Sequence, residues 1–267
     1  MTNNNNGHHI SDFTRDLVAS GKYHFTTKDA CIGLGSSVHA VRAALSRIAR
    51  RGDITSPFRG FYVIVPPEYR STGCLPAPQF IPQLAAHIGI NYYVALLSAA
   101  EYHGAAHQRP QVFQVMVEKN RKRIECGSVK IAFIARKRMS NVATMDINTP
   151  RGFLCVSTSE ATALDCIGYP GHCGGLSNVA GIIAELAESM KSDKLVTAAK
   201  ACPISWVQRL GYILELVGAE DLKKVLASYV AKHAKAPALL DPYLRHTPTT
   251  YLRTWKLLLN KKVQFEK

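Results

Sequence analysis

Residues that can bind zinc gather in the stretch DCIGYPGHC, which holds Asp165, Cys166, His172 and Cys173. Zinc sites usually combine two Cys or His pairs at defined spacing, and no second pair follows here. The glycine and proline in this stretch favour a turn that ends a helix. His103 and His107 could share a helix face, but Gly104 interrupts the helix and no HExxH glutamate lies between them. We therefore expect no metal and no cofactor.

Carboxylates that could hold a divalent metal for nucleic-acid chemistry are Asp146, Glu160 and Asp165. A restriction-type nuclease needs a strand-borne acid followed by Glu-x-Lys, and the chain lacks that pattern. A nucleotidyltransferase needs Gly-Ser followed by metal-binding acids, whereas GSSVHA and GSVKIA contain none. A Walker-type phosphate loop is also missing. The sequence therefore predicts a protein that is not an enzyme, with a cryptic nuclease or phosphotransferase as the alternative.

The balance of charges points to a polyanionic partner. The 267 residues include 33 lysines and arginines against 19 acids, which gives a net charge of +14. The positive charge is concentrated in two segments, Arg42–Arg59 and Arg109–Arg138. Such clusters favour nucleic acid, an acidic protein or a membrane surface. The uncharged span between Arg70 and Glu101 contains several prolines and glycines, so it cannot cross a membrane as one helix, and we expect no membrane partner.

The cysteines indicate a reducing compartment. The chain has 7 cysteines, which are scattered and form no CxxC motif. An odd, dispersed set argues against a disulfide framework. The sequence MTNNNNGHHI at the start is polar and lacks the apolar region of a signal peptide. We expect a cytoplasmic protein.

The pattern over residues 10–66 predicts a winged helix-turn-helix domain. A short helix over Ile10–Gly21 precedes a second one that begins near Thr26, and paired glycines then turn the chain. A serine at 36 or 37 begins a third helix, whose apolar positions are Val38, Val41, Leu45 and Ile48. Gly52 ends this helix, and a β-hairpin that turns at Arg59-Gly60 follows.

Polar and basic side chains occupy the opposite face of the third helix. Arginine can contact guanine O6 and N7 or bind phosphate, and serine can contact either. We expect His39, Arg42 and Ser46 to reach bases, and Arg50, Arg51 and Arg59 to hold phosphates. The predicted DNA-binding set is Ser36, Ser37, His39, Arg42, Ser46, Arg47, Arg50, Arg51 and Arg59. The alternative is a winged helix that serves protein contacts only. A helix-turn-helix protein that reads an inverted repeat would bind it as a homodimer.

The rest of the chain predicts a second domain. The Pro- and Gly-rich segment at residues 66–79 marks the boundary. After it we expect helices at Phe80–Ile88 and Tyr92–Tyr102, then strands, then helices. The expected strands are Gln111–Glu118, Ser128–Arg136, Ala143–Asn148 and Gly152–Ser157, and the later helices are 158–168, 176–190, 193–201, 204–217 and 219–233. The fold class is therefore α+β, with the N-terminal winged helix-turn-helix domain followed by a larger α+β domain over residues 80–267 whose C-terminal half is helical.

A basic run in the second domain, KNRKRIECGSVK, has two interpretations. One is a solvated hairpin tip, which is the usual role of a charge run. The other is a second surface for DNA, for dimer alignment or for an acidic partner. The residues concerned are Lys119, Arg121, Lys122, Arg123, Arg136, Lys137 and Arg138. Aromatic residues do not interleave with them, so stacking on single strands is not indicated.

Several stretches together resemble one known family. HAVRAALSRIARRGDITSPFRGFYVIVP resembles the N-terminal winged helix of AbiEi-family antitoxins from type IV toxin–antitoxin systems. YYVALLSAAEYHG, TPRGFLCVSTSEATALDCIGYPGHCGGL, WVQRLGYILELVG and RTWKLLLN are similar to later parts of that family, in the same order over roughly residues 12–260. The resemblance implies a cytoplasmic prokaryotic repressor of its own operon. It also implies that the second domain counteracts a cognate toxin of nucleotidyltransferase type, directly or indirectly.

Overall fold

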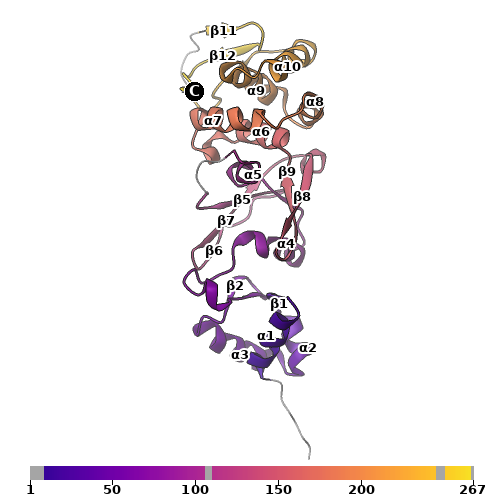
Figure 1. Cartoon of the computed structure of the whole chain (residues 1–267), viewed down its shortest axis with the longest axis vertical. Helices are drawn as coiled ribbons and strands as arrows, with labels where there is room; N and C mark the ends of the chain where they lie inside the picture. Colours follow the sequence, from indigo (N-terminus) through magenta and orange to yellow (C-terminus); the bar gives the residue numbers. More distant parts are fainter. Residues whose placement is uncertain (1–8, 106–109, 245–249, 266–267) are drawn as a thin grey trace, which may run out of the picture.

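The computed structural model describes residues 9–105, 110–244 and 250–265. The molecule is elongated, and three blocks follow one another along its long axis (Figure 1). Small N-terminal helices lie at one end, a six-stranded sheet occupies the middle, and the C-terminal helices lie at the other end. This combination of helices with separate sheets confirms the α+β class.

The N-terminal block is formed by α1 (Ile10–Ala19), β1 (His24–Thr26), α2 (Thr27–Leu34), α3 (Val38–Arg50), β2 (Ile54–Phe58) and β3 (Phe61–Ile64). The strands form an antiparallel sheet in the order β1-β3-β2. Thr26 and Asp29 form a capping box that begins α2. Gly35, with φ of 56°, ends α2 and allows the turn into α3.

Two details of this block differ from the sequence prediction. Val38 was expected on the buried face of the third helix, yet it is 48% exposed, while Val41 and Leu45 are buried. Val38 is the first residue of α3, and the described part of the chain leaves that end of the apolar stripe largely uncovered. The second difference is β1, whose central Phe25 is buried. Pairing with β3 makes this short segment a strand, and its local sequence alone did not indicate one.

The segment at residues 66–79, which the sequence predicted as a domain boundary, packs against both the N-terminal block and the central sheet. It contains the 3₁₀ turns Pro67–Tyr69 and Ala77–Gln79. Cys74 and Leu75 are fully buried, in the same apolar cluster as Phe61 of β3 and residues of the central sheet. The N-terminal block is therefore joined to the central sheet by a shared core.

The central sheet has the order β6-β7-β5-β4-β9-β8. Its strands are β4 (Tyr92–Val94), β5 (Phe113–Val117), β6 (Ile124–Cys126), β7 (Val129–Ala135), β8 (Thr144–Thr149) and β9 (Gly152–Ser157). Two neighbouring pairs, β5–β7 and β4–β9, are parallel, and the other pairs are antiparallel. The helices α4 (Ile81–Ile88) and α5 (Leu96–Tyr102) flank β4 in the chain.

The helix predicted over Tyr92–Tyr102 is wrong at its start. The first three residues form β4, which lies between β5 and β9, and only Leu96–Tyr102 is helical. Tyr93 and Val94 are buried there. Aromatic and β-branched residues fit a buried strand well, so pairing on both sides decides the conformation of this segment.

The C-terminal half is helical, as predicted. It comprises α6 (Ser159–Gly168), α7 (Leu176–Ala187), α8 (Ser192–Lys200), α9 (Ile204–Val217) and α10 (Glu220–His233). A small sheet of β10 (Ala238–Leu239), β11 (Thr250–Leu252) and β12 (Leu257–Leu259), which the sequence did not predict, packs beyond these helices. Trp255 precedes β12 and is buried against Gly211 of α9. Within the described ranges, no helix is long and apolar enough to cross a membrane.

Candidate nucleic-acid interface

The exposed face of α3 carries the side chains that the sequence predicted for DNA contact. Ser37 caps the helix, with its Oγ accepting a hydrogen bond of 3.4 Å from the backbone of Ala40. Val41, Leu45 and Ile48 are buried beneath the helix. The remaining predicted residues of the helix and its flanks are all exposed: Ser36, Ser37, His39, Arg42, Ser46, Arg47, Arg50 and Arg51.

The arginines of α3 differ in the contacts they make. Arg51 Nε lies 3.0 Å from Asp53, which also pairs with Arg70 beyond β3. This arrangement fixes the C-terminal end of α3 to the following segment. Arg42 and Arg47, in contrast, form no ion pair with any residue that the structure describes. Their guanidinium groups are available to an external anion.

The hairpin of β2 and β3 is held against α4 and the central sheet. Arg59 lies at its tip, and Gly60 has φ of 76°, which the tight turn requires. Nε2 of His87 on α4 lies 3.2 Å from the carbonyl oxygen of Arg59. Further along the hairpin, Oγ1 of Thr55 lies 2.9 Å from Sγ of Cys126 on β6. The backbone of the hairpin is thus fixed, while the side chain of Arg59 remains exposed.

A groove of about 610 Å³ joins the two basic segments that the sequence treated separately. Phe58 and Arg59 line one side, and Arg121, Lys122 and Arg123 line the other. We call this the hairpin groove. It places the basic run of the second domain directly beside the tip of the N-terminal hairpin.

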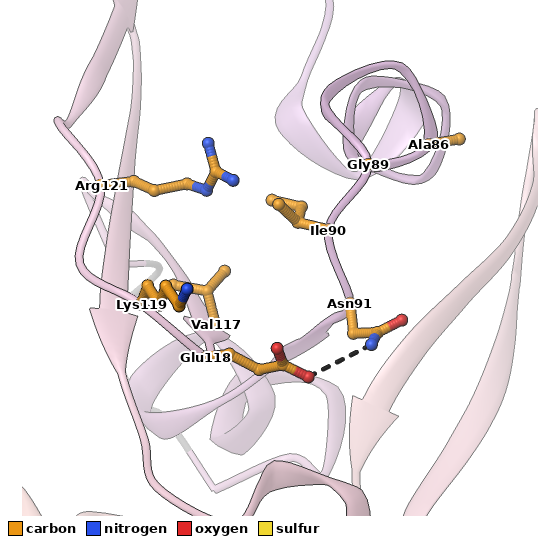
Figure 2. Close-up of a pocket in the computed structure, with 8 residues that line it drawn as sticks. All are labelled: Ala86, Gly89, Ile90, Asn91, Val117, Glu118, Lys119 and Arg121. Carbon is orange, nitrogen blue, oxygen red and sulfur yellow. Dashed lines mark hydrogen bonds between the residues drawn. The ribbon is translucent and has the colours of Figure 1, made fainter.

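The basic run itself lies on the surface, with residues 119–123 between β5 and β6 and residues 137–138 after β7. Six of its predicted residues are exposed: Lys119, Arg121, Lys122, Arg123, Lys137 and Arg138. Arg123 is partly neutralised by Glu125, at 3.2 Å. A second hollow has a volume of about 410 Å³. Figure 2 shows that Arg121 and Lys119 lie across this hollow from Ile90 and Asn91. Asn91 Nδ2 donates a hydrogen bond of 3.2 Å to Glu118 there.

Arg136, which the sequence placed in this basic surface, is buried instead. Its side chain is only 3% exposed, and Nε lies 2.9 Å from Oδ1 of Asp165. Nη2 donates to Sγ of Cys202 at 3.1 Å, and the guanidinium lies 5.6 Å from the ring centre of Trp206. The local sequence shows three consecutive basic residues, which favour an exposed surface. Arg136 turns inward because it pairs with Asp165 of α6, a contact that the local sequence does not reveal.

Burial dominates the electrostatics of Asp165. It raises the pKa of this carboxyl to about 6, while Arg136 and the hydrogen bond from Tyr93 act in the opposite direction. The Tyr93 hydroxyl donates to Oδ2 at 2.9 Å. Both oxygens of Asp165 therefore serve internal contacts.

The other residues that the sequence offered for metal binding or catalysis do not come together in one site. Glu160 is buried, and its Oε1 accepts a hydrogen bond from the backbone of Lys191 at 3.0 Å. Asp146 is exposed on β8. Cys166 and Cys173 are fully buried, and among the described residues no cluster of His, Cys, Asp or Glu could hold a metal ion. His103 Nε2 lies 2.7 Å from the carbonyl oxygen of Ser157, and His107 lies outside the described residues.

Residues that the sequence did not indicate lie beside the candidate interface. His87 and Thr55 hold the hairpin, and neither residue was predicted as a contact residue. Trp206 is partly buried, and its ring meets that of Tyr169 edge to face, with ring centres 5.4 Å apart. Only the tertiary structure brings these residues beside the basic segments.

Comparison with known proteins gives a family match for the middle part of the chain. Residues 93–216 match the family model of the AbiEi antitoxin C-terminal domain, which confirms the resemblance seen in the sequence. The chain therefore carries an AbiEi-family antitoxin domain. No curated protein matches the chain.

Two solved structures match the chain, one over nearly its whole length and one over less than half of it. The crystal structure of the RV2827C protein from Mycobacterium tuberculosis matches with a TM-score of 0.66 and 17% identity, over 94% of this chain and 90% of that one. The two chains share a fold over nearly their full lengths. The solution structure of the antibiotic-resistance factor ANT(2'')-Ia gives a TM-score of 0.33 and 9% identity, over 45% of this chain and 86% of that one. A score that low does not indicate a shared fold.

Proposed function

We propose that this protein is an antitoxin that also binds DNA and represses its own promoter. Residues 10–66 form a winged helix-turn-helix domain in this proposal, and residues 80–267 form the antitoxin domain. The partner toxin is a nucleotidyltransferase that the second domain counteracts, directly or indirectly. The protein acts without catalysis or cofactor, in the cytoplasm, and two copies read an inverted repeat.

The order of elements in the N-terminal block supports a DNA-binding role. Three helices with an interposed strand precede a hairpin, and β1 pairs with the second strand of that hairpin. A short turn at Gly35 separates α2 from α3, as in a helix-turn-helix. In such a domain α3 enters the major groove and the hairpin lies beside the phosphate backbone.

The observation that carries the proposal is the free basic face of α3. Arg42 and Arg47 are exposed and unpaired within the described chain, on the side of the helix opposite its buried residues. In our assignment His39, Arg42 and Ser46 contact bases, whereas Arg50, Arg51 and Arg59 hold phosphates. Lys119, Arg121, Lys122, Arg123, Lys137 and Arg138 extend the phosphate-binding surface past the hairpin groove.

A gel-shift series with the full chain tests the DNA-binding role. The probes are the native promoter and a random duplex of equal length, at physiological salt. We expect the promoter to bind more tightly, and we expect Arg42→Ala to reduce that preference by about 1–3 kcal/mol. Arg253→Ala is the matched control, because Arg253 is exposed near β11, at the far end of the molecule.

Unchanged affinity and preference in Arg42→Ala would show that α3 is not the recognition helix. Equal affinity of the unmodified chain for promoter and random duplex would instead assign the N-terminal block to protein assembly. The antitoxin role is tested separately, by co-expressing the chain with a nucleotidyltransferase encoded beside it. Growth that the chain fails to restore would contradict that role.

A further inference from the structure

A cavity of about 800 Å³ lies where two parallel strands of the central sheet end. Lys119 and Asn120 follow the end of β5, and Arg136–Arg138 follow the end of β7. Tyr169 and Trp206, from the helical half, form the opposite wall. We call this the strand-end cavity. In open sheets, ligands bind outside the carboxyl ends of parallel strands, and typical ligand pockets measure about 300–1,000 Å³.

A buried cation lines this cavity. Arg136 Nε lies 2.9 Å from Oδ1 of Asp165 as an ion pair without hydrogen-bond geometry, and Nη2 donates to Cys202. Its Nη1 is buried and has no hydrogen-bond partner within the described residues. A buried N–H group without an acceptor is unfavourable, and native proteins satisfy nearly all such groups. Arg136 is therefore a donor with unused capacity at the wall of the cavity.

The rim of the cavity is positively charged. Lys119, Lys137 and Arg138 are exposed there, against a single carboxylate, Glu118. None of the three cations forms an ion pair in the part of the chain that the structure describes. Unpaired cations around a concave surface attract anions, because the field is concentrated inside the hollow.

The remaining wall is apolar and aromatic. The rings of Tyr169 and Trp206 meet edge to face, with Ala135, Ala201 and Pro203 beside them. A phosphate ion would fill only a small part of this cavity and leave the aromatic wall in contact with water. A ligand that joins a planar ring to an anionic tail would use both the wall and the rim.

We propose that the strand-end cavity binds a nucleoside triphosphate. The base lies against Trp206 and Tyr169, and the phosphates meet Lys119, Lys137 and Arg138. The buried guanidinium of Arg136 donates its free N–H to the ligand. The cavity shares Lys119, Lys137 and Arg138 with the proposed extension of the DNA-binding surface but includes no residue of α3, so the inference does not depend on base recognition by α3.

The test uses the full chain with ATP and GTP, measured by titration calorimetry and tryptophan fluorescence. The chain has two tryptophans, and Trp255 is only 1% exposed, so Trp206 should dominate any response. Tripolyphosphate and adenosine are the comparison ligands. We expect at least one nucleotide to bind more tightly than either, and Trp206→Phe to abolish the fluorescence change.

Two double variants separate local contacts from net charge. Lys137→Glu with Arg138→Glu should weaken nucleotide binding at least about tenfold, since two charge-assisted contacts are reversed. Lys194→Glu with Lys235→Glu makes the same change in net charge at exposed positions outside the cavity and should leave affinity unchanged. Four results would overturn the proposal: no nucleotide binding, tripolyphosphate binding as tightly as ATP, a response that persists in Trp206→Phe, or equal effects of the two double variants.

Discussion

Arg136 and Asp165 form a buried ion pair that joins the end of β7 to α6, with Nε 2.9 Å from Oδ1. Asp165 is fully buried and Arg136 nearly so. The pair links the central sheet to the helical half, and Tyr93 of β4 completes it through its hydroxyl. Removing one member of such a pair leaves an uncompensated charge in the interior.

Asp165→Ala should therefore lower the free energy of unfolding at neutral pH by about 3–5 kcal/mol. Chemical denaturation followed by circular dichroism measures this change. Asp165→Asn is the comparison variant, because its amide oxygen can still accept the hydrogen bond from Tyr93, and we expect it to lose less. A loss below about 1 kcal/mol in Asp165→Ala would mean that Arg136 finds solvent or another partner.

The raised pKa of Asp165 predicts a dependence of stability on pH. Burial raises this pKa from 3.8 to about 6 in the folded protein. Between these values the folded state binds more protons at this carboxyl than the unfolded state does. The extra stability that comes from protonation of Asp165 is thus fully present below about pH 4 and is lost as the pH rises through about 6, whereas the pairing of the ionised carboxylate with Arg136 remains.

The measurement compares the unfolding free energy of the wild type with that of Asp165→Asn across this range. The difference should shift against the wild type as the pH rises, because only the wild type loses a proton there. A difference that stays constant between about pH 4 and pH 7 would show that the carboxyl is already ionised at the lower limit.

Alanine substitutions at two helical glycines should change the stability of the protein in opposite directions. A methyl group at Gly211 of α9 would overlap the indole ring of Trp255, whereas Gly181 of α7 has nothing within 4 Å of the same position. Gly211→Ala should destabilise the protein by about 1–3 kcal/mol through overpacking. Gly181→Ala should stabilise it by about 0.4–1 kcal/mol, because alanine favours the helix. Thermal unfolding of both variants checks the prediction, and a stabilised Gly211→Ala would contradict the packing of Trp255.

Local patterns predicted most helices because each helix signal lies within the helix itself. Ser37, Val41, Leu45 and Ile48 were sufficient to place α3 and its buried face. The β-strand at Tyr92–Val94 was missed because its conformation depends on β5 and β9, which come later in the chain. Local pattern cannot report a partner that lies far away in sequence.

In the candidate site, too, features that depend on local sequence were predicted, and features that depend on long-range contacts were not. The exposure of Arg42 follows from helical periodicity, and the sequence predicted it. The burial of Arg136 depends on Asp165, and the position of Lys122 beside Arg59 depends on the contact between His87 and the hairpin. These relationships arise only when the sheet and the two blocks pack together.

The hairpin groove predicts how Lys122 contributes to DNA binding. Because Lys122 lies across the groove from Arg59, a duplex held by the hairpin would pass close to its ammonium group. A phosphate contact carries no sequence information, so Lys122→Ala should weaken promoter and random duplex alike. It should also lower the slope of log affinity against log salt by about one, the loss of a single released counterion. Binding measured at several salt concentrations tests this, with Lys194→Ala as the matched exposed control. If Lys122→Ala changed base preference while the salt slope stayed the same, Lys122 would contact a base and the division of roles between α3 and the basic run would be wrong.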